Sequence, residues 1–187
     1  MNNRDDINKY IITGGPGSGK STLLNALSNA GYNCFEEISR IIIQEQHAKG
    51  GNKLPWNDLE GFAKICYQRM TIQLDKSPNT EICFYDRALP DIIAYMRRGQ
   101  LPVPKIFYER CTSYNSLVFI APPWEEIFVN DDERPESYQD SVEIFQFLQN
   151  TYEELKFKVI QLPRCSVKSR VDFIHSHINS LSIPKSR

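Results

Sequence analysis

The chain has 187 residues and a mass of 21.7 kDa, a size that predicts a single domain over residues 1–187 with a core from about residue 8 to about 178. Hydrophobic residues make up 41% and charged residues 24%, which is typical of a globular protein in solution and argues against charge-driven disorder. The 22 basic and 23 acidic residues give a net charge of −1, so a general nucleic-acid partner is disfavoured.

Membrane and secretion signals are also missing from the sequence. No stretch approaches the roughly 18 consecutive apolar residues of a membrane helix, and residues 1–6 are polar. The five cysteines are widely spaced, which predicts neither a zinc site nor a disulfide framework. We therefore expect a cytoplasmic protein without a membrane partner.

Apolar runs and helical periodicities alternate along the chain. The runs at residues 82–85 and 117–121 lack alternation, which is typical of strands covered on both faces of a parallel sheet. The predicted strands cover residues 9–13, 32–36, 82–85, 117–121 and 158–162. The predicted helices cover residues 20–30, 38–49, 55 to about 70, 89–98, 105–113, 142–155 and 167–178. This pattern predicts an α/β domain with a five-stranded, mostly parallel sheet and ligands at the carboxyl ends of the strands.

The strongest motif lies between the first predicted strand and the first predicted helix. Residues 14–21 match G-x-x-x-x-G-K-[ST] at every fixed position. Glycines let backbone N–H groups turn inward around phosphate oxygens, and the positive end of the following helix points to the same place. A glycine turn without a ligand is the alternative, which the strand–helix context disfavours. The predicted nucleotide-binding residues are Gly14, Gly15, Pro16, Gly17, Ser18, Gly19, Lys20, Ser21 and Thr22.

Within this loop, Lys20 is expected to reach the β- and γ-phosphates and to act in catalysis. The Ser21 hydroxyl is the predicted Mg²⁺ ligand, and Thr22 is a weaker candidate for that role. ATP is preferred over GTP because the sequence has no guanine-specific N-K-x-D motif. Together with the predicted elements, the loop predicts a P-loop NTPase fold of three α/β/α layers.

A second acidic group near Mg²⁺ usually follows a buried strand in such proteins. Asp86 ends the apolar run at residues 82–85, so it is predicted to hold Mg²⁺ or to accept a proton from a substrate hydroxyl. Arg87 follows and is a predicted substrate-binding residue that contacts a phosphate or a carboxylate. A helix cap at Asp86 and a surface charge at Arg87 are the structural alternatives.

Two further charged groups are candidates. Glu37 and Arg40 lie three residues apart, so one helical face can present both to a phosphoryl acceptor, and Glu37 can orient or deprotonate its hydroxyl. An ordinary solvated ion pair is the alternative. Arg134 lies in a charged, irregular segment that predicts a lid over residues 122–140, where it would stabilise transition-state charge. A solvated charge run is the alternative there.

The sequence resembles a known group at several of these places. It is similar to the P-loop ATPase and kinase family that includes the nicotinamide riboside kinase domain of bifunctional NAD regulators, often catalogued as an AAA-type ATPase domain. The resemblance covers roughly residues 8–178 and implies a five-stranded parallel sheet, ATP or GTP with Mg²⁺, a helical lid, and roles for Glu37, Asp86, Arg87 and Arg134. It rests on residues 12–21, 37–40, 84–91 with Ala94 and Tyr95, and 131–134.

These observations predict an ATP-binding enzyme that uses Mg²⁺ to transfer the γ-phosphate to a hydroxyl of a nucleoside-like metabolite. The alternative is a regulatory NTPase with slow hydrolysis and a macromolecular partner. No residue is clearly placed to orient a hydrolytic water, which favours transfer. The sequence leaves the acceptor and the oligomeric state open.

Overall fold

The structure is a computed structural model and describes residues 4–129 and 135–181. Five strands form one sheet in the order β2-β3-β1-β4-β5, and all four neighbouring pairs are parallel. The predicted α/β class is therefore confirmed, and all the strand pairs are parallel. The strands are β1 (Lys9–Gly14), β2 (Asn33–Phe35), β3 (Cys83–Asp86), β4 (Leu117–Ala121) and β5 (Lys158–Gln161).

The three inner strands carry the core of the domain. Every residue of β1, β3 and β4 is buried, whereas β2 and β5 at the edges are half-buried or exposed. Side chains alternate between the two faces of the sheet, so Ile11 and Ile12 of β1 belong to different hydrophobic clusters. Both clusters need apolar residues, which explains why these strands read as continuous apolar runs.

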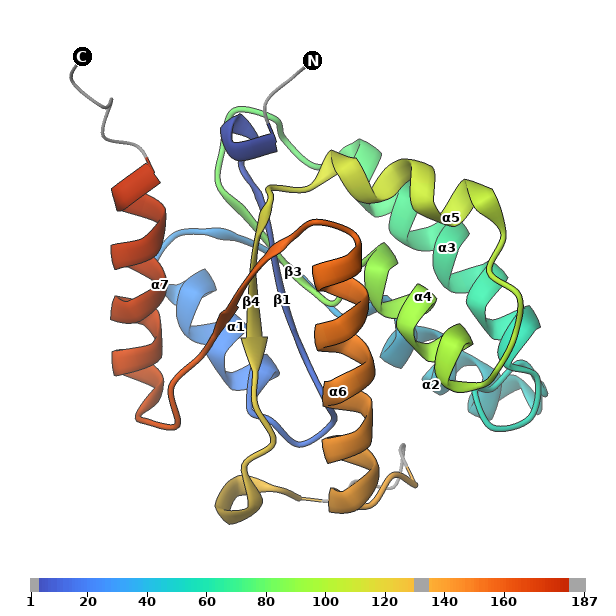
Figure 1. The fold of residues 1–187 in the computed structure, drawn as a ribbon. Coiled ribbons are helices and arrows are strands. Elements are labelled where there is room, and N and C mark those ends of the chain that lie inside the picture. The colour runs from blue at the N-terminus through green and yellow to red at the C-terminus, as the bar shows by residue number, and fades with distance from the viewer. Residues whose placement is uncertain (1–3, 130–134, 182–187) are drawn as a thin grey trace.

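Helices cover both faces of the sheet and complete the predicted three layers (Figure 1). Helices α1 (Lys20–Asn29) and α7 (Val167–Leu181) lie on one face, where their apolar residues form one cluster with Tyr10, Ile12 and Phe84. The other face carries the larger cluster. The helices on that face are α2 (Ile38–Lys49), α3 (Leu59–Lys76), α4 (Leu89–Arg98), α5 (Lys105–Glu109) and α6 (Tyr138–Glu154). Short 3-10 turns lie at Arg4–Asp6, Arg110–Ser113 and Glu125–Ile127.

Two predicted helix starts are wrong, and the capping residues explain both. The third helix begins at Leu59 rather than Pro55, because the Asp58 side chain accepts the Gly61 N–H at 2.8 Å and caps the first turn. Helix α6 begins at Tyr138 rather than at residue 142, because Ser137 and Asp140 form a capping box. Apolar periodicity missed the first turn of α6, where the residues are polar.

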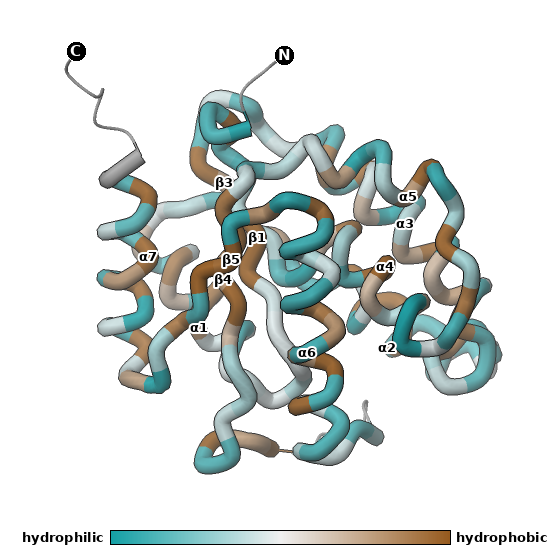
Figure 2. The backbone as a smooth tube through the Cα atoms, viewed as in Figure 1, coloured by the Kyte–Doolittle hydropathy of each residue, from teal (hydrophilic) through white to brown (hydrophobic). Residues whose placement is uncertain are grey.

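Hydropathy follows this layering. Figure 2 shows hydrophobic stretches along the central strands and hydrophilic stretches on the outer turns of the helices. The cysteines are free thiols, as predicted, and Cys66, Cys83 and Cys111 are buried. Across the described ranges 4–129 and 135–181, no helix is long and apolar enough to cross a membrane.

Candidate functional site

The predicted phosphate-binding loop joins β1 to α1, so its strand–loop–helix context is as expected. Gly14 and Gly17 have φ values of +144° and +70°, which L side chains rarely adopt. A Cβ on Gly14 would lie 2.4 Å from the Ala121 carbonyl oxygen, and a Cβ on Gly17 would lie 2.4 Å from the Phe128 ring. Backbone conformation and close neighbours therefore both require glycine at these two positions.

The polar groups of the loop gather around one hollow. The Nζ of Lys20 is buried and donates to the Gly15 carbonyl oxygen at 2.8 Å and to the Ser18 hydroxyl at 3.4 Å. Ser21 and Thr22 follow on the exposed side of α1. Residues 17–22 line a hollow of about 190 Å³ at the amino end of α1. An ammonium group and the positive end of a helix thus face one space, which suits a polyphosphate.

Two side chains from distant segments hold the outside of the loop. Ser141 of α6 donates to the Pro16 carbonyl oxygen at 2.8 Å. Arg170 of α7 donates to the Ser18 carbonyl oxygen at 3.1 Å and to the Pro163 carbonyl oxygen at 2.8 Å. Its guanidinium also lies 4.9 Å from the centre of the Trp124 ring, and burial lowers its pKa. Arg170 therefore ties the loop to α7 and to the segment after β4.

Asp86 lies at the carboxyl end of β3, where it pairs in register with Ile12 of β1. It is buried, and it lines a hollow of about 260 Å³ together with Ser21. Mg²⁺ prefers oxygen ligands and usually takes one or two from the protein, with the rest from water and phosphates. The hydroxyl of Ser21 and the carboxylate of Asp86 fit that requirement, so both predicted metal ligands face the same space.

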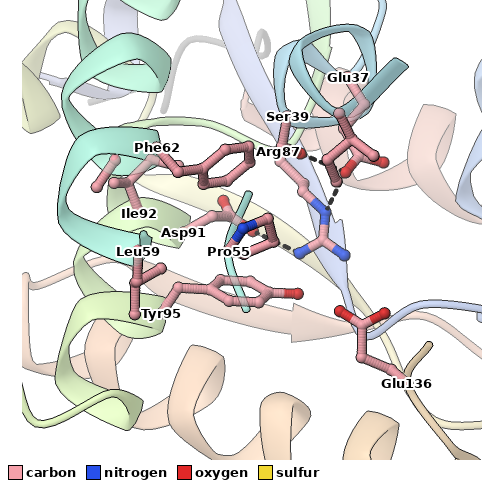
Figure 3. Close-up of a pocket in the computed structure, with 12 residues that line it drawn as sticks. Glu37, Ser39, Pro55, Leu59, Phe62, Arg87, Asp91, Ile92, Tyr95 and Glu136 are labelled. Carbon is pink, nitrogen blue, oxygen red and sulfur yellow. Dashed lines mark hydrogen bonds and ion pairs between the residues drawn. The ribbon is translucent and has the colours of Figure 1, made fainter. Parts of the chain in front are cut away.

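Arg87 follows in a left-handed backbone conformation, with φ +63°. Its guanidinium is buried between two carboxylates: Nε lies 3.0 Å from Glu37, and Nη1 lies 3.5 Å from Asp91 (Figure 3). Although burial alone lowers it, the pKa of Arg87 stays well above its usual value because the phenol of Tyr95 and the neighbouring carboxylates raise it. This side chain is therefore a fixed cation in the wall of the site.

Glu37 lines three neighbouring spaces of the site. It is the N-cap residue of α2, it is buried, and the Ser39 hydroxyl donates to its Oε1 at 2.5 Å. It lines the hollow along the P-loop and the hollow beside Asp86, and it also lines a third pocket. Arg40 lines the first two of these spaces but not the third. The structure therefore places Glu37 on both sides of the site and Arg40 on the phosphate side.

The third pocket has an apolar wall and a polar end (Figure 3). Leu59 and Phe62 of α3 and Ile92 and Tyr95 of α4 are among the residues of the apolar wall. The polar end holds the Glu37–Arg87–Asp91 group and Glu136. The Oε2 atom of Glu136 is buried and has no hydrogen-bond partner among the described residues. The free space in this pocket is about 30 Å³, so the structure shows an apolar wall beside a polar end and not a cavity already wide enough for a nucleoside-sized molecule.

Two further sequence predictions, the role of Arg134 and the lid over residues 122–140, concern the segment that follows β4. Arg134 lies outside the described residues, so its role stays a prediction. In the described part of the predicted lid, Phe128 lies against Gly17, and Ile127 and Val129 line the hollow at the P-loop. In the turn before α7, the Ser166 hydroxyl accepts the Ser169 N–H at 3.2 Å, so it caps the helix.

Sequence reasoning gave no role to Asp91, Glu136, Ser141 or Arg170. Asp91 had one usable signal, since an acidic residue in the first turn after Leu89 and Pro90 is typical of a capped helix start. Glu136 resembled the other acidic residues of its segment. Ser141 and Arg170 lie far from the loop in the sequence, and only the fold brings them to it.

The sheet order, the loop and the strand-end carboxylate define a P-loop nucleotide-binding fold. A family model described as an AAA domain matches residues 9–170. The chain belongs to this AAA domain family, as the resemblance predicts. A search of curated proteins gave no significant match.

Three solved structures share the fold at low sequence identity. Deoxyadenosine kinase from M. mycoides, with products dCMP and dCDP, has a TM-score of 0.63 and 21% identity, over 92% of this chain and 99% of that one. Shikimate kinase from Acinetobacter baumannii, with shikimate, has a TM-score of 0.60 and 15% identity, over 92% and 93%. NadR protein in complex with NR has a TM-score of 0.61 and 19% identity, over 96% of this chain and 52% of that one.

Proposed function

We propose that this protein is an ATP-dependent kinase that uses Mg²⁺ to phosphorylate a hydroxyl of a nucleoside-like small molecule. The observation that carries the proposal is the position of Glu37, which lines both the hollow at the P-loop and the third pocket. We call the third pocket the acceptor pocket. A carboxylate shared by the two spaces is where a phosphoryl donor and an acceptor hydroxyl would meet. The kinase folds reported above support the same reading, since each of the named kinases handles a small molecule.

In this proposal, different residues bind the phosphates, hold the metal and accept the proton. Backbone N–H groups of the P-loop and Lys20 bind and orient the phosphates, and Glu37 accepts the proton of the acceptor hydroxyl. Ser21 and Asp86 would hold Mg²⁺, which neutralises phosphate charge when bound. Arg87 is fixed between its two carboxylates and bounds the acceptor pocket.

The charge of the acceptor pocket supports an acceptor without a phosphate group. Among its described lining residues, Arg87 is the single cation, and it is already paired with Glu37 and Asp91. Glu136 adds a third carboxylate. A nucleoside monophosphate would bring more negative charge into this pocket, and like charges at close range repel. We therefore propose a nucleoside rather than a nucleotide as the acceptor.

The test is a panel of acceptors with ATP and Mg²⁺, read by mass spectrometry of the phosphorylated product. The panel holds deoxynucleosides, ribonucleosides, nicotinamide riboside and shikimate, with the matching nucleoside monophosphates as negative controls. We expect at least one nucleoside to gain a phosphate, and Glu37→Gln to slow that reaction by about 10²-fold or more. The control is Glu109→Gln, which changes an exposed glutamate that lines none of the three spaces and is expected to react like the wild type.

Other outcomes would decide against the proposal. Phosphorylation of monophosphates in preference to nucleosides would overturn the charge argument. ATP hydrolysis at an unchanged rate in the presence of every acceptor, with no phosphorylated product, would favour the regulatory NTPase instead.

A further inference from the structure

The carboxylate of Asp91 has four polar partners near the site. It is fully buried, and it accepts the Thr13 hydroxyl on Oδ1 at 2.5 Å and the Tyr152 hydroxyl on Oδ2 at 2.5 Å. The Ala88 N–H donates to Oδ2 at 2.9 Å, and Nη1 of Arg87 lies 3.5 Å from Oδ1. A buried carboxylate without such partners would be strongly unfavourable, so these four groups are what allow it to remain inside.

The four groups belong to three separate parts of the fold. Thr13 is in β1, immediately before the first residue of the phosphate-binding loop, and Tyr152 is in α6. Ala88 is the N-cap residue of α4, and Asp91 is the third residue of that helix. One carboxylate therefore joins the P-loop strand, the start of α4 and α6 at a single point.

The backbone and the side chain of Arg87 are both held by contacts that involve Asp91. Its left-handed backbone costs free energy for a residue with a Cβ, so its surroundings must hold it there. The Ala88 N–H bond to Asp91 fixes the backbone just after Arg87, and the Arg87 N–H donates to the Ile12 carbonyl oxygen at 3.0 Å. The side chain is then held by Glu37 on one side and Asp91 on the other.

We propose that Asp91 is a positioning residue: through its bonds to Thr13, Tyr152 and Ala88 it holds the Arg87 guanidinium in the acceptor pocket at a fixed place relative to the P-loop. The effect on turnover rests on the proposed kinase function, whereas the effect on Arg87 itself does not. Thr13 does not line the acceptor pocket, and its hydroxyl donates to Asp91, so we expect an influence of the Thr13 hydroxyl on acceptor binding to pass through Asp91.

The first experiment needs no acceptor. In ¹⁵N-labelled protein, NMR measures the rotation of the Arg87 guanidinium about its Nε–Cζ bond, with the signal assigned by its loss in Arg87→Lys. We expect Asp91→Asn to speed this rotation by about tenfold or more, because it removes the buried ion pair in which Nη1 of Arg87 lies 3.5 Å from Asp91. The control is Glu154→Gln, which removes the carboxylate from an exposed pair with Arg97 between the same two helices and is expected to leave the Arg87 signal unchanged.

Two milder variants protect this test against a folding defect in Asp91→Asn. Thr13→Val and Tyr152→Phe each remove one hydroxyl donor and keep the charge and nearly the shape of the site. Each is expected to speed the rotation of Arg87 by a smaller factor, and the double variant by more than either. Wild-type rotation in folded Asp91→Asn, or in the double variant if Asp91→Asn does not fold, overturns the proposal.

The second experiment uses turnover with whichever panel acceptor the wild type phosphorylates. We expect Asp91→Asn and Thr13→Val to raise the KM for the acceptor and to leave the KM for ATP nearly unchanged. In an Arg87→Gln background, Asp91→Asn should have little further effect on kcat/KM. Fully additive losses would show that Asp91 acts independently of Arg87 and would refute the positioning role. If no acceptor is phosphorylated, the kinase function fails while the NMR result still decides the role of Asp91.

Discussion

The phosphate-binding loop is contiguous in the sequence, whereas the pocket proposed for the acceptor takes its residues from four separate segments, residues 37–43, 55–63, 87–95 and 136. The loop offers mainly backbone groups and one lysine, and the pocket offers side chains with buried charges. A backbone cradle recognises phosphate whatever the rest of the ligand is, whereas a pocket of side chains can change its ligand by single substitutions. Nucleotide binding should thus be the more constant property of this fold and acceptor choice the more variable one.

The largest effect should come from a substitution of Lys20, which we expect to lower turnover without unfolding the domain. Lys20→Ala removes the ammonium that faces the phosphates, and we expect turnover to fall by about 10²- to 10³-fold, as for other lost donors to transition-state charge. The exposed Lys168 gives a control, since Lys168→Ala should retain full turnover. Circular dichroism and thermal unfolding check that the fold is kept. Turnover within twofold of the wild type would contradict the role of Lys20.

The next largest effect should come from Asp86, which lines the hollow between the P-loop residue Ser21 and Glu37. Asp86→Asn keeps the shape of the side chain but weakens a metal ligand, so we expect the rate at limiting Mg²⁺ to fall by about 10- to 100-fold. Calorimetric titration with ATP in the absence of Mg²⁺ should give wild-type affinity. A rate loss that saturating Mg²⁺ does not reduce at all would count against metal binding by Asp86.

A smaller effect tests whether the conformation of the phosphate-binding loop depends on the contact between Gly17 and Phe128. Gly17 and Gly50 have φ values of +70° and +62°, but a Cβ on Gly17 meets the Phe128 ring, whereas a Cβ on Gly50 has nothing within 4 Å. Gly50→Ala should lower the free energy of unfolding by about 1 kcal/mol through backbone strain alone and leave nucleotide affinity unchanged.

Gly17→Ala should cost more and should also weaken binding of AMP-PNP, measured by calorimetry. A second substitution, Phe128→Ala, makes room for the new methyl group and should restore part of the affinity. Equal stability losses in the two alanine variants, with unchanged affinity, would show that the Phe128 contact does not shape the loop.

The smallest effect concerns the core that both regions share. Burial raises the pKa of Cys34 to about 11 and that of Cys111 to about 12. Unfolded thiols ionise near pH 9 while the folded ones stay protonated, so this contribution to stability is complete below about pH 8 and is lost as the pH rises towards 11 and 12. We expect Tm to be about 5 °C lower at pH 11 than at pH 8. The decline should be shallower in Cys111→Ala, and an equally steep decline would contradict the assignment.

The same contrast explains what the sequence could predict. The strands, the layers and the P-loop follow from local patterns, because apolar runs, glycines and a Lys-Ser pair act within a few residues of one another. The first turn of α6 escaped because its capping box is polar. The pairing of Glu37 with Arg87 could not be predicted, because it depends on β2 lying beside β3. The contacts of Arg170 and Ser141 with the loop could not be predicted for the same reason, because only the order of the strands brings α6 and α7 next to the loop.

β1, the strand that leads into the phosphate-binding loop, lies in the middle of the sheet, and both of its neighbours are synthesised after it. β1 lies between β3 and β4, and Arg170, 152 residues further along the chain, donates to the Ser18 carbonyl oxygen. A nascent chain that has emerged only as far as β2 has a phosphate-loop strand with neither neighbour in place. Nucleotide capture on the ribosome should accordingly wait until β3, β4 and α7 have all been synthesised, because these elements supply the neighbours of β1 and the Arg170 bond to the loop.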